Sequence, residues 1–331
     1  MSSGTILLTG GAGYIGSFIA RSLRESGRPH VVLDDLSEGK AAAARGSVIE
    51  TIDLRDRESL SEVLVRHRVE WIIHMAAHSI VCESMTAPEK YWRNNVVGSL
   101  TLIEEARRAR VSGMVFSSTA AVYGEPESVP IDEKQPCVPT NFYGETKIAI
   151  ERVLAACHAA YGLRSISLRY FNAAGATPDG SMGESHSKET HLIPLVLGAA
   201  LGTRPPVTVL GTDYPTPDGT GVRDYIHVED LADAHVLALD ALSAESTGAE
   251  NFNLGGGAGR SVREVLDVSE RITGRRIPRT EGARRAGDPA VLIASSAKAR
   301  ERLGWVPRRS DLATIVETAW KWHRDHPCGH E

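Results

Sequence analysis

Cysteine, aromatic residues and long hydrophobic runs are all scarce in this chain of 331 residues. Its four cysteines, Cys82, Cys137, Cys157 and Cys328, lie far apart without a CxxC pair, and its histidines have no ligand spacing with them. This argues against a disulfide framework and a zinc enzyme. No apolar run approaches the roughly 18 residues of a membrane span, and no basic leader precedes the strand pattern at Thr5–Leu8. We therefore expect a cytoplasmic protein with reduced thiols, no metal site and no membrane partner.

An excess of charge is also missing. The formal net charge is −5, which argues against nucleic acid as a partner, although local basic groups can still bind one diphosphate. Hydrophobic residues make up 42% of the chain, enough for a sizeable core. The length is roughly twice that of a typical domain, so we expect two lobes.

The first half of the chain alternates short apolar runs with amphipathic segments. This pattern is typical of a parallel sheet with helices on both faces. Amphipathic periodicity predicts helices such as Tyr14–Glu25 and Leu100–Arg110. The predicted strands are Thr5–Thr9, His30–Leu33, Ser47–Ile52, Trp71–His74, Gly113–Ser117 and Arg164–Arg169. The fold class is therefore α/β, a Rossmann doubly wound parallel sheet.

The second half has a different texture. Gly, Pro, Thr and Asp become frequent after about Phe171, which predicts a loop-rich lobe. The apolar run 226–241 and the strand-like segment 251–254 resemble core elements of the first lobe. We predict a Rossmann domain over residues 1–171, with the chain re-entering it near 222–258, and a smaller C-terminal α/β substrate-binding lobe mainly over 172–331.

A glycine loop follows the first predicted strand. Gly11, Gly13 and Gly16 satisfy G-x-G-x-x-G at the opening of a helix, where glycine allows a tight turn and close approach of a pyrophosphate to the helix N-terminus. The alternative is a glycine-rich turn without a ligand. The motif predicts a dinucleotide site.

Carboxylates end the second and third predicted strands. Asp34 stands roughly 20 residues beyond the loop, where a carboxylate accepts hydrogen bonds from ribose hydroxyls and repels a 2′-phosphate, so NAD is favoured over NADP. The adjacent Asp35 leaves open which side chain points inward. Asp53 either contacts the adenine amine or caps a helix.

Three residues describe redox chemistry beside this loop. Tyr143 and Lys147 are four residues apart and share one helix face, where the cation favours the phenolate form of Tyr143 as a general base. Thr119 follows the fifth predicted strand, at the sheet edge where ligands bind in this architecture. The alternative, a surface aromatic beside a solvated lysine, is disfavoured by the glycine loop.

These motifs resemble the extended short-chain dehydrogenase/reductase superfamily and, within it, the UDP-glucose 4-epimerase family. The resemblance covers nearly the whole chain. Its most specific part is the segment from Thr216 to Val228. The other matching segments are Gly10–Gly16, His74–Ala77, Asn94–Val96, Ser118–Gly124, Tyr143–Lys147, Arg169–Asn172 and Arg284–Pro289.

The resemblance implies an isomerase that interconverts UDP-glucose and UDP-galactose. Tyr143 is expected to take the proton of the sugar 4-hydroxyl while C4 gives hydride to tightly held NAD, and the keto sugar then turns and is reduced on its other face. Lys147 is expected to contact the nicotinamide ribose and lower the phenol pKa, and Thr119 to guide the proton. The implied cofactor contacts are Gly10, Gly13, Tyr14, Ile15, Gly16, Asp34, Asp35, Asp53, Leu54, Met75, Ala76, Ala77, Asn95, Ser117, Ser118, Tyr143, Lys147 and Tyr170.

The residues after Thr119 separate two activities of this superfamily. Dehydratases and decarboxylases that resemble this chain place Asp or Glu there as an acid or base for elimination. This chain has Ala120 and Ala121, which cannot transfer a proton. The sequence therefore favours epimerisation over loss of water.

The nucleotide-sugar site is expected in the second lobe. Arg223 and Arg285 are candidates for a diphosphate clamp because guanidinium groups bind phosphate in a fork geometry, and Asn172 is a further donor. By resemblance, the substrate contacts also include Thr119, Tyr143, Leu192, Thr208, Leu210, Tyr225 and Asp288.

Two positions depart from the family pattern. His191 stands where relatives often carry asparagine, which predicts altered hydrogen bonding or pH response. Leu292 aligns with a position that gates access for an N-acetyl group and is smaller than the tyrosine of some relatives. We therefore hypothesise relaxed specificity towards UDP-N-acetylhexosamines.

Two alternatives stay open beside the leading interpretation. One keeps the C4 chemistry but uses UDP-N-acetylglucosamine or UDP-xylose/arabinose. The other is a non-catalytic NAD-binding protein of this fold, which the intact Tyr143 and Lys147 disfavour. The resemblance also implies a homodimer, formed through the amphipathic stretches Tyr91–Arg110 and Lys147–Tyr161, whose apolar faces equally suit an intramolecular core.

Overall fold

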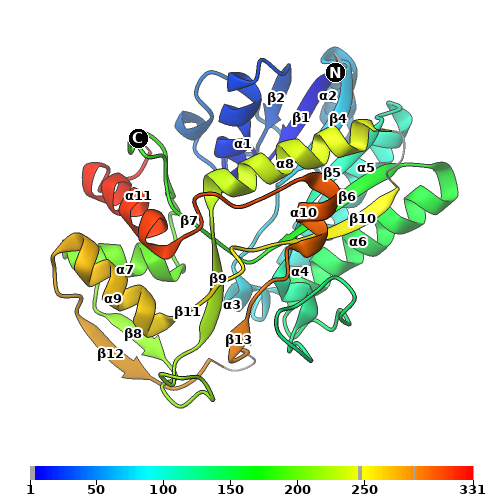
Figure 1. Ribbon diagram of the computed structural model, residues 1–331. Coiled ribbons are helices and arrows are strands. Elements are labelled where there is room, and N and C mark those ends of the chain that lie inside the picture. The colour runs from blue at the N-terminus through cyan, green and yellow to red at the C-terminus, as the bar shows by residue number, and fades with distance from the viewer. Residues whose placement is uncertain (1–3, 245–247, 286–287, 331) are drawn as a thin grey trace.

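A seven-stranded parallel sheet forms the centre of the larger lobe in this computed structural model, which describes residues 4–244, 248–285 and 288–330 (Figure 1). The strand order is β3-β2-β1-β4-β5-β6-β10, and the chain reverses direction across the sheet between β1 and β4. The strands are β1 (Thr5–Thr9), β2 (His30–Leu33), β3 (Val48–Glu50), β4 (Val69–His74), β5 (Gly113–Thr119), β6 (Arg164–Tyr170) and β10 (Ala249–Leu254).

The predicted strands are all present, with shifts at some ends. β1 and β2 have the predicted bounds, whereas β3 is shorter and lies at the edge of the sheet, where β2 is its one partner among the described residues. β5 and β6 run further than predicted, since their pairing continues to Thr119 and Tyr170. Strand β10 pairs with β6, so this late segment lies in the larger lobe. The predicted domain boundaries themselves stay a prediction.

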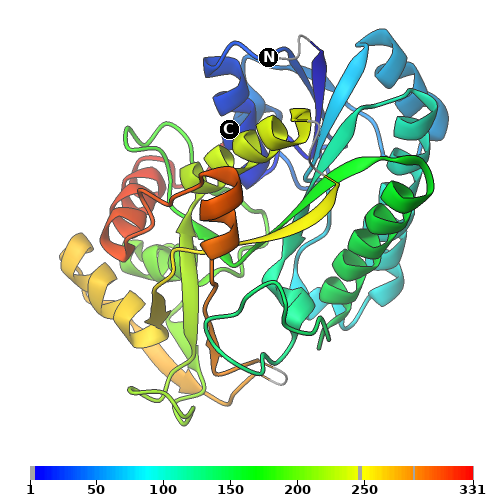
Figure 2. The same cartoon turned by 45° about the vertical axis from the view of Figure 1, so that its right-hand side comes forward.

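Helices cover both faces of the sheet, as the turned view makes clear (Figure 2). Successive side chains of a strand point to opposite faces, so Leu8 packs in one core and Leu7 in the other. The first core is covered by α1 (Tyr14–Glu25), α8 (Val228–Ser243) and α10 (Ala297–Leu303). The second is covered by α2 (Arg57–Arg66), α5 (Gly98–Arg108) and α6 (Phe142–Tyr161).

The segment before α5 is less regular than predicted. α1 matches its predicted bounds, but α5 begins two residues earlier than expected, at Gly98, and ends at Arg108. It continues directly from a π-helical stretch, Trp92–Val97. Two short helices, α3 (Val81–Ser84) and α4 (Pro88–Tyr91), precede that stretch. A 3₁₀ turn, Ala120–Tyr123, follows β5.

The smaller lobe combines short strands with three helices. Strand β9 ends at His227 and α8 begins at Val228, so one continuous segment connects the two lobes. β9 pairs with β7, β11 and β13, and β8 pairs with β12. The elements are β7 (Asn172–Ala174), β8 (Val207–Leu210), β9 (Val222–His227), β11 (Gly259–Ser261), β12 (Arg279–Gly282), β13 (Val291–Leu292), α7 (Leu192–Leu201), α9 (Val262–Thr273) and α11 (Leu312–Asp325).

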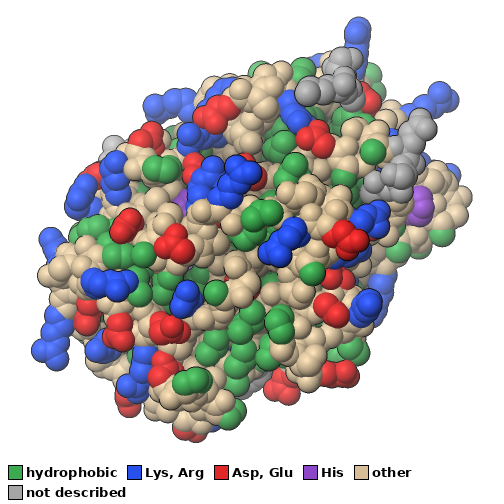
Figure 3. Space-filling view, viewed as in Figure 1, with side chains coloured by type: hydrophobic (Ala, Val, Ile, Leu, Met, Phe, Trp, Pro, Cys, Tyr) green, Lys and Arg blue, Asp and Glu red, His purple; other side chains and the backbone are tan. Residues whose placement is uncertain are grey.

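Surface charge is mixed on the face that Figure 3 displays, where basic and acidic side chains are interspersed. This distribution agrees with the small net charge and gives no extended basic patch on that face. Among the residues described, none of the helices has the length and apolar character needed to cross a bilayer.

Candidate active site

A cavity of about 820 Å³ extends from the glycine loop to the smaller lobe. Its wall contains residues that follow β1, β2, β4 and β5, together with residues of α6, α7 and β9. It therefore opens at the carboxyl ends of the parallel strands, on the side where the strand order reverses. This volume lies within the range of small-molecule sites.

The glycines of this loop have no side chains that would keep a ligand away from the backbone. Gly10 has φ of +70°, and a Cβ there would lie 2.6 Å from the backbone nitrogen of Ala76. A Cβ on Gly16 would lie 2.1 Å from the carbonyl oxygen of Gly10. α1 begins at Tyr14, and no side chain caps its first turn. The loop thus fits a pyrophosphate, which the free N–H groups and the helix dipole attract.

Asp34 supports this loop directly. Its Oδ2 accepts a hydrogen bond from the Ala12 amide at 2.9 Å, and its Oδ1 accepts one from the Leu36 amide at 2.9 Å. Burial raises the pKa of Asp34, while these two backbone bonds oppose the rise. Asp35 is more exposed and accepts from Ser37. Both carboxylates line the cavity, and each retains lone pairs for ribose hydroxyls.

Asp53 lines the same cavity and is not a helix cap. Its carboxylate binds the guanidinium of Arg55, with Arg55 Nε at 2.9 Å from Oδ1, and this bond lowers the pKa of Asp53. The N-cap of α2 is Asp56, whose side chain accepts from the Ser59 amide at 3.2 Å. The capping alternative for Asp53 is therefore wrong, because the helix starts one turn later.

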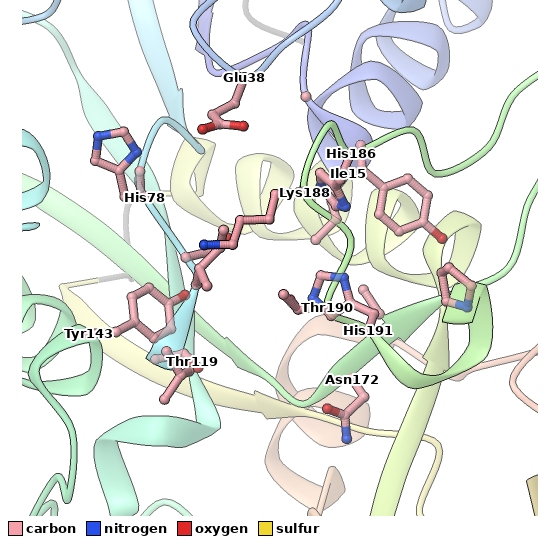
Figure 4. A pocket seen from close by; sticks show the side chains of 18 of the residues that line it. Ile15, Glu38, His78, Thr119, Tyr143, Asn172, His186, Lys188, Thr190 and His191 are labelled. Carbon is pink, nitrogen blue, oxygen red and sulfur yellow. The ribbon is translucent and has the colours of Figure 1, made fainter. Parts of the chain in front are cut away.

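Tyr143 and Lys147 project from the first turns of α6 into the cavity. Asn141 caps this helix by accepting a hydrogen bond from the Gly144 amide, which fixes where the helix begins. Lys147 Nζ donates to the carbonyl oxygen of Ser117 at 2.8 Å and lies 5.8 Å from the centre of the Tyr143 ring. Thr119 ends β5 and accepts from the Ala121 amide at 3.1 Å. Figure 4 shows the side chains of Thr119 and Tyr143 side by side.

Burial controls the protonation of this pair. It lowers the pKa of Lys147 to about 7, against the opposing charge of Glu151. Burial also raises the pKa of Tyr143, as does nearby Tyr170, and the Thr119 hydroxyl acts in the opposite direction. The predicted lowering of the phenol pKa by Lys147 is thus outweighed in this arrangement, because both groups lose water and the ammonium points to Ser117.

Most predicted cofactor contacts share this wall. The two exceptions, Ser118 and Asn95, are explained by side-chain direction. Ser118 alternates with Ser117 and Thr119 on β5 and donates to buried Glu151 instead. The side chain of Asn95 is hydrogen-bonded to the His78 amide and the Thr146 hydroxyl. The predicted residues that line the cavity are Gly10, Gly13, Tyr14, Ile15, Gly16, Asp34, Asp35, Asp53, Leu54, Met75, Ala76, Ala77, Ser117, Tyr143, Lys147 and Tyr170.

The far end of the cavity belongs to the smaller lobe. Arg223 Nη2 pairs with Asp288 Oδ1, and Arg223 Nη1 donates to the Val222 carbonyl at 2.7 Å. Ala286 and Gly287 of the predicted motif lie outside the described residues. The predicted substrate contacts that line the cavity are Thr119, Tyr143, Asn172, His191, Leu192, Thr208, Leu210, Arg223, Tyr225, Arg285 and Asp288.

Leu292 is the predicted substrate contact that does not line the cavity. It packs against the cluster of Val122, Tyr123 and Ile131, as does Phe171, which lines the wall. Any effect of Leu292 on an N-acetyl group would therefore be indirect.

Several lining residues were missed by the sequence analysis. Glu38, His78, Lys188 and Thr190 point into the cavity in Figure 4, with Lys188 between Tyr143 and His191 in this view. Their loops have no periodicity from which a side-chain direction can be predicted. His186 was missed as well, although its spacing to Glu184, Glu189 and His191 is visible in the sequence.

Comparisons with known proteins agree with this geometry. Residues 6–255 match the NAD dependent epimerase/dehydratase family. The UDP-glucose 4-epimerase of Lacticaseibacillus casei is 51% identical over 327 residues, 98% of each chain. The Brucella ovis UDP-glucose 4-epimerase structure in complex with NAD is 46% identical, with a TM-score of 0.93 over 96% of this chain and 97% of that one. The Bifidobacterium longum structure, with NAD+ and UDP, is 35% identical, with a TM-score of 0.93 over 98% of this chain and 99% of that one. This chain therefore belongs to the NAD dependent epimerase/dehydratase family, among its UDP-glucose 4-epimerases.

Proposed function

We propose that this chain interconverts UDP-glucose and UDP-galactose by transient oxidation at C4. The observation that carries the proposal is the placement of Tyr143, Lys147 and Thr119 in one cavity with the glycine loop and two arginines, Arg223 and Arg285. The relatives described above carry the same activity in their names.

Tyr143 is the proton carrier in this proposal. Its phenolate takes the proton of the sugar 4-hydroxyl as C4 becomes a ketone, and the resulting hydroxyl returns the proton after the sugar has turned over. Thr119 orients the sugar oxygen, and Lys147 holds the catalytic helix against β5 through Ser117. Bound NAD supplies the acceptor and donor of hydride at C4 and a positive charge that lowers the phenol pKa.

The surroundings of Thr119 fit epimerisation and not elimination. Ala120 is buried directly after Thr119, and Ala121 follows. Neither side chain can add or remove a proton at C5 or C6, so these two positions give no support to the loss of the 6-hydroxyl. The cavity leaves room for the sugar to turn while the nucleotide stays anchored.

Arg223 and Arg285 anchor the diphosphate in this proposal. The pairing of Arg223 with Asp288 holds one guanidinium in place and leaves part of its fork facing the cavity. Tyr225 lies two residues after Arg223 in β9, and its buried side chain forms part of the cavity wall. The residues proposed to bind the diphosphate therefore lie on the smaller lobe, apart from the catalytic groups on α6 and β5.

The chain is also proposed to act as a cytoplasmic homodimer. Trp92 and Val97 are each 42% exposed, and Tyr161 is 39% exposed, within the two stretches predicted to form the interface. Large exposed apolar side chains on neighbouring helices favour association with a second copy of this chain. The four cysteines are free, which suits a reducing compartment.

The deciding experiment uses UDP-galactose and purified protein without added cofactor, with UDP-glucose followed by NMR. Tyr143→Phe is expected to lower conversion by at least about 100-fold, because the proton carrier is lost. Tyr161→Phe, the same change near the exposed end of α6, is the matched control and is expected to retain full activity. A parallel reaction with UDP-N-acetylglucosamine tests the wider specificity. No conversion by the unmodified protein, even with NAD added, would overturn the proposal.

A further inference from the structure

Four side chains of one loop converge just before α7. Glu184, His186, Glu189 and His191 each offer one nitrogen or oxygen atom, and these four atoms lie within 4.8 Å of one another. The loop lines the cavity, and Figure 4 shows His186 and His191 on the opposite side of this view from Tyr143. No step of the proposed reaction uses this cluster.

The four atoms are close enough together to surround one metal ion, and the two shortest contacts, those of Glu184, would lengthen around it. Glu184 Oε1 lies 2.7 Å from His191 Nδ1 and 3.0 Å from His186 Nδ1. The carboxylate of Glu189 lies 3.1 Å from His191 Nδ1 and 3.5 Å from His186 Nδ1. Ligands about 2.1 Å from a tetrahedral zinc ion stand about 3.4 Å apart.

The orientation of Glu184 is a second and independent observation. This side chain is 4% exposed, and its Oε1 has no hydrogen bond despite its two close imidazole neighbours. The two ring Nδ1 atoms lie near this oxygen without the geometry of a hydrogen bond, whereas His191 Nδ1 contacts Glu189 Oε1 at 3.1 Å. The lone pairs of Glu184 Oε1 are thus left for an ion.

The charge of the cluster can be balanced in two ways. The carboxylates of Glu184 and Glu189 are each 3% exposed, and two buried anions this close need compensating positive charge. One dication with two neutral imidazoles supplies it. The competing arrangement is an ion-pair cluster with two protonated histidines, but it does not explain the direction of Glu184 Oε1. His191 is half exposed and gives an ion a route from the cavity.

We propose that Glu184, His186, Glu189 and His191 bind one divalent first-row transition metal ion, with zinc the best match to two nitrogen and two oxygen ligands. All four positions are taken by protein, so the ion is structural and not catalytic. The proposal differs from the expectation of no metal site. That expectation rested on the spacing between histidines and cysteines and left glutamates out of account.

The site would tie three parts of the chain together. The Glu184 carbonyl accepts a hydrogen bond from Trp322 Nε1 of α11 at 2.9 Å. The His186 ring meets the Tyr14 ring of the glycine loop edge to face, with centroids 6.3 Å apart. The ion would therefore hold the loop that closes one side of the cavity against both lobes. This proposal does not depend on which sugar the enzyme uses.

The test measures metal content and cobalt spectra on the full-length, tag-free protein. Protein purified in zinc-containing buffer and then gel-filtered is analysed for metal per chain by mass spectrometry, and chelator-treated protein is titrated with Co²⁺. We expect about one zinc per chain and the intense visible bands of tetrahedral cobalt. The His186→Gln/Glu189→Gln variant is expected to lose both. His67→Gln is the matched control, because His67 also pairs with a carboxylate, Glu50, at 2.6 Å but lies outside the cluster.

Each outcome is decisive. Stoichiometric metal and tetrahedral cobalt bands in the unmodified protein and in His67→Gln, both lost in the double variant, support the site. Absence of both signals in the unmodified protein overturns it and leaves the ion-pair cluster, whatever the variant does. Binding that is equally strong in the double variant is adventitious and also overturns it. Should the double variant not fold, His191→Gln is compared instead, with at least tenfold weaker zinc binding expected.

Discussion

The ammonium of Lys147 donates a hydrogen bond to the carbonyl oxygen of Ser117 at 2.8 Å. This contact joins α6, which carries Tyr143, to the end of β5, which carries Thr119. Together with the hydrogen bond from Ser118 to Glu151, this contact holds the three catalytic candidates at a fixed separation. Lys147 itself is buried, at 2% exposed.

Lys147→Met is expected to lower kcat by about 100-fold or more, since the ammonium that positions α6 and favours the phenolate is lost. Affinity for UDP should change little, because the proposed anchors lie on the smaller lobe. The measurement is steady-state epimerisation together with UDP binding by calorimetry. Lys90→Met, which removes an exposed lysine paired with Glu83, is the control. Full activity of Lys147→Met would contradict the assigned role.

Gly16→Ala is expected to abolish retention of NAD. Its Cβ would lie 2.1 Å from the Gly10 carbonyl oxygen, so the loop must move away from the pyrophosphate position. The measurement is NAD content per chain after gel filtration. Gly98→Ala is the matched control, since its Cβ meets Leu54 at an ordinary 3.5 Å. Equal NAD content in the two variants would show that the loop is not the cofactor site.

Glu151→Gln is expected to lower the free energy of unfolding by about 3–5 kcal/mol, because it leaves the Arg169 charge buried without its partner. The two side chains are 3% and 4% exposed, and Arg169 Nε donates to Glu151 Oε1 at 2.9 Å. Urea denaturation at fixed NAD concentration measures the change. Asp240→Asn breaks the exposed pair with Arg28 and should cost less than about 1 kcal/mol. Similar losses for both variants would refute the argument from burial.

His235 is expected to make the protein sensitive to acid. Burial lowers the pKa of this histidine to about 4, against about 6.5 in an unfolded chain. Above pH 6.5 His235 is neutral in both the folded and the unfolded protein, so the free energy of unfolding does not change through this residue. Between pH 6.5 and 4 the unfolded state binds the extra proton, so the free energy of unfolding falls by up to about 1.4 kcal/mol per pH unit.

His235→Leu removes this titration. We expect the variant to lose less stability than the unmodified protein when the pH is lowered from 7 to 4, as measured by urea denaturation at several pH values. The Nε2 atom of His235 has no hydrogen bond among the described residues, so leucine forfeits the bond between Nδ1 and the Leu231 carbonyl and the edge contact with the Tyr170 ring. Parallel pH profiles for the two proteins would exclude His235 as the source.

The sequence by itself determined the features that depend on local spacing. The glycine loop after β1, the pair of Tyr143 and Lys147 on one helix face, and the alternation of strands with helices follow from the periods of regular structure. Each of these needs only neighbouring residues and a known repeat. For this reason the α/β class and the catalytic candidates were accessible before the structure.

Only the tertiary structure decided where side chains point outside those repeats. It placed Asp34 under the glycine loop, paired Asp53 with Arg55, turned Ser118 towards Glu151 and kept Leu292 off the cavity wall. It also brought Glu184, His186, Glu189 and His191 together in a loop without a period. These outcomes depend on which distant segments pack against each residue, and a local pattern contains no information about such contacts.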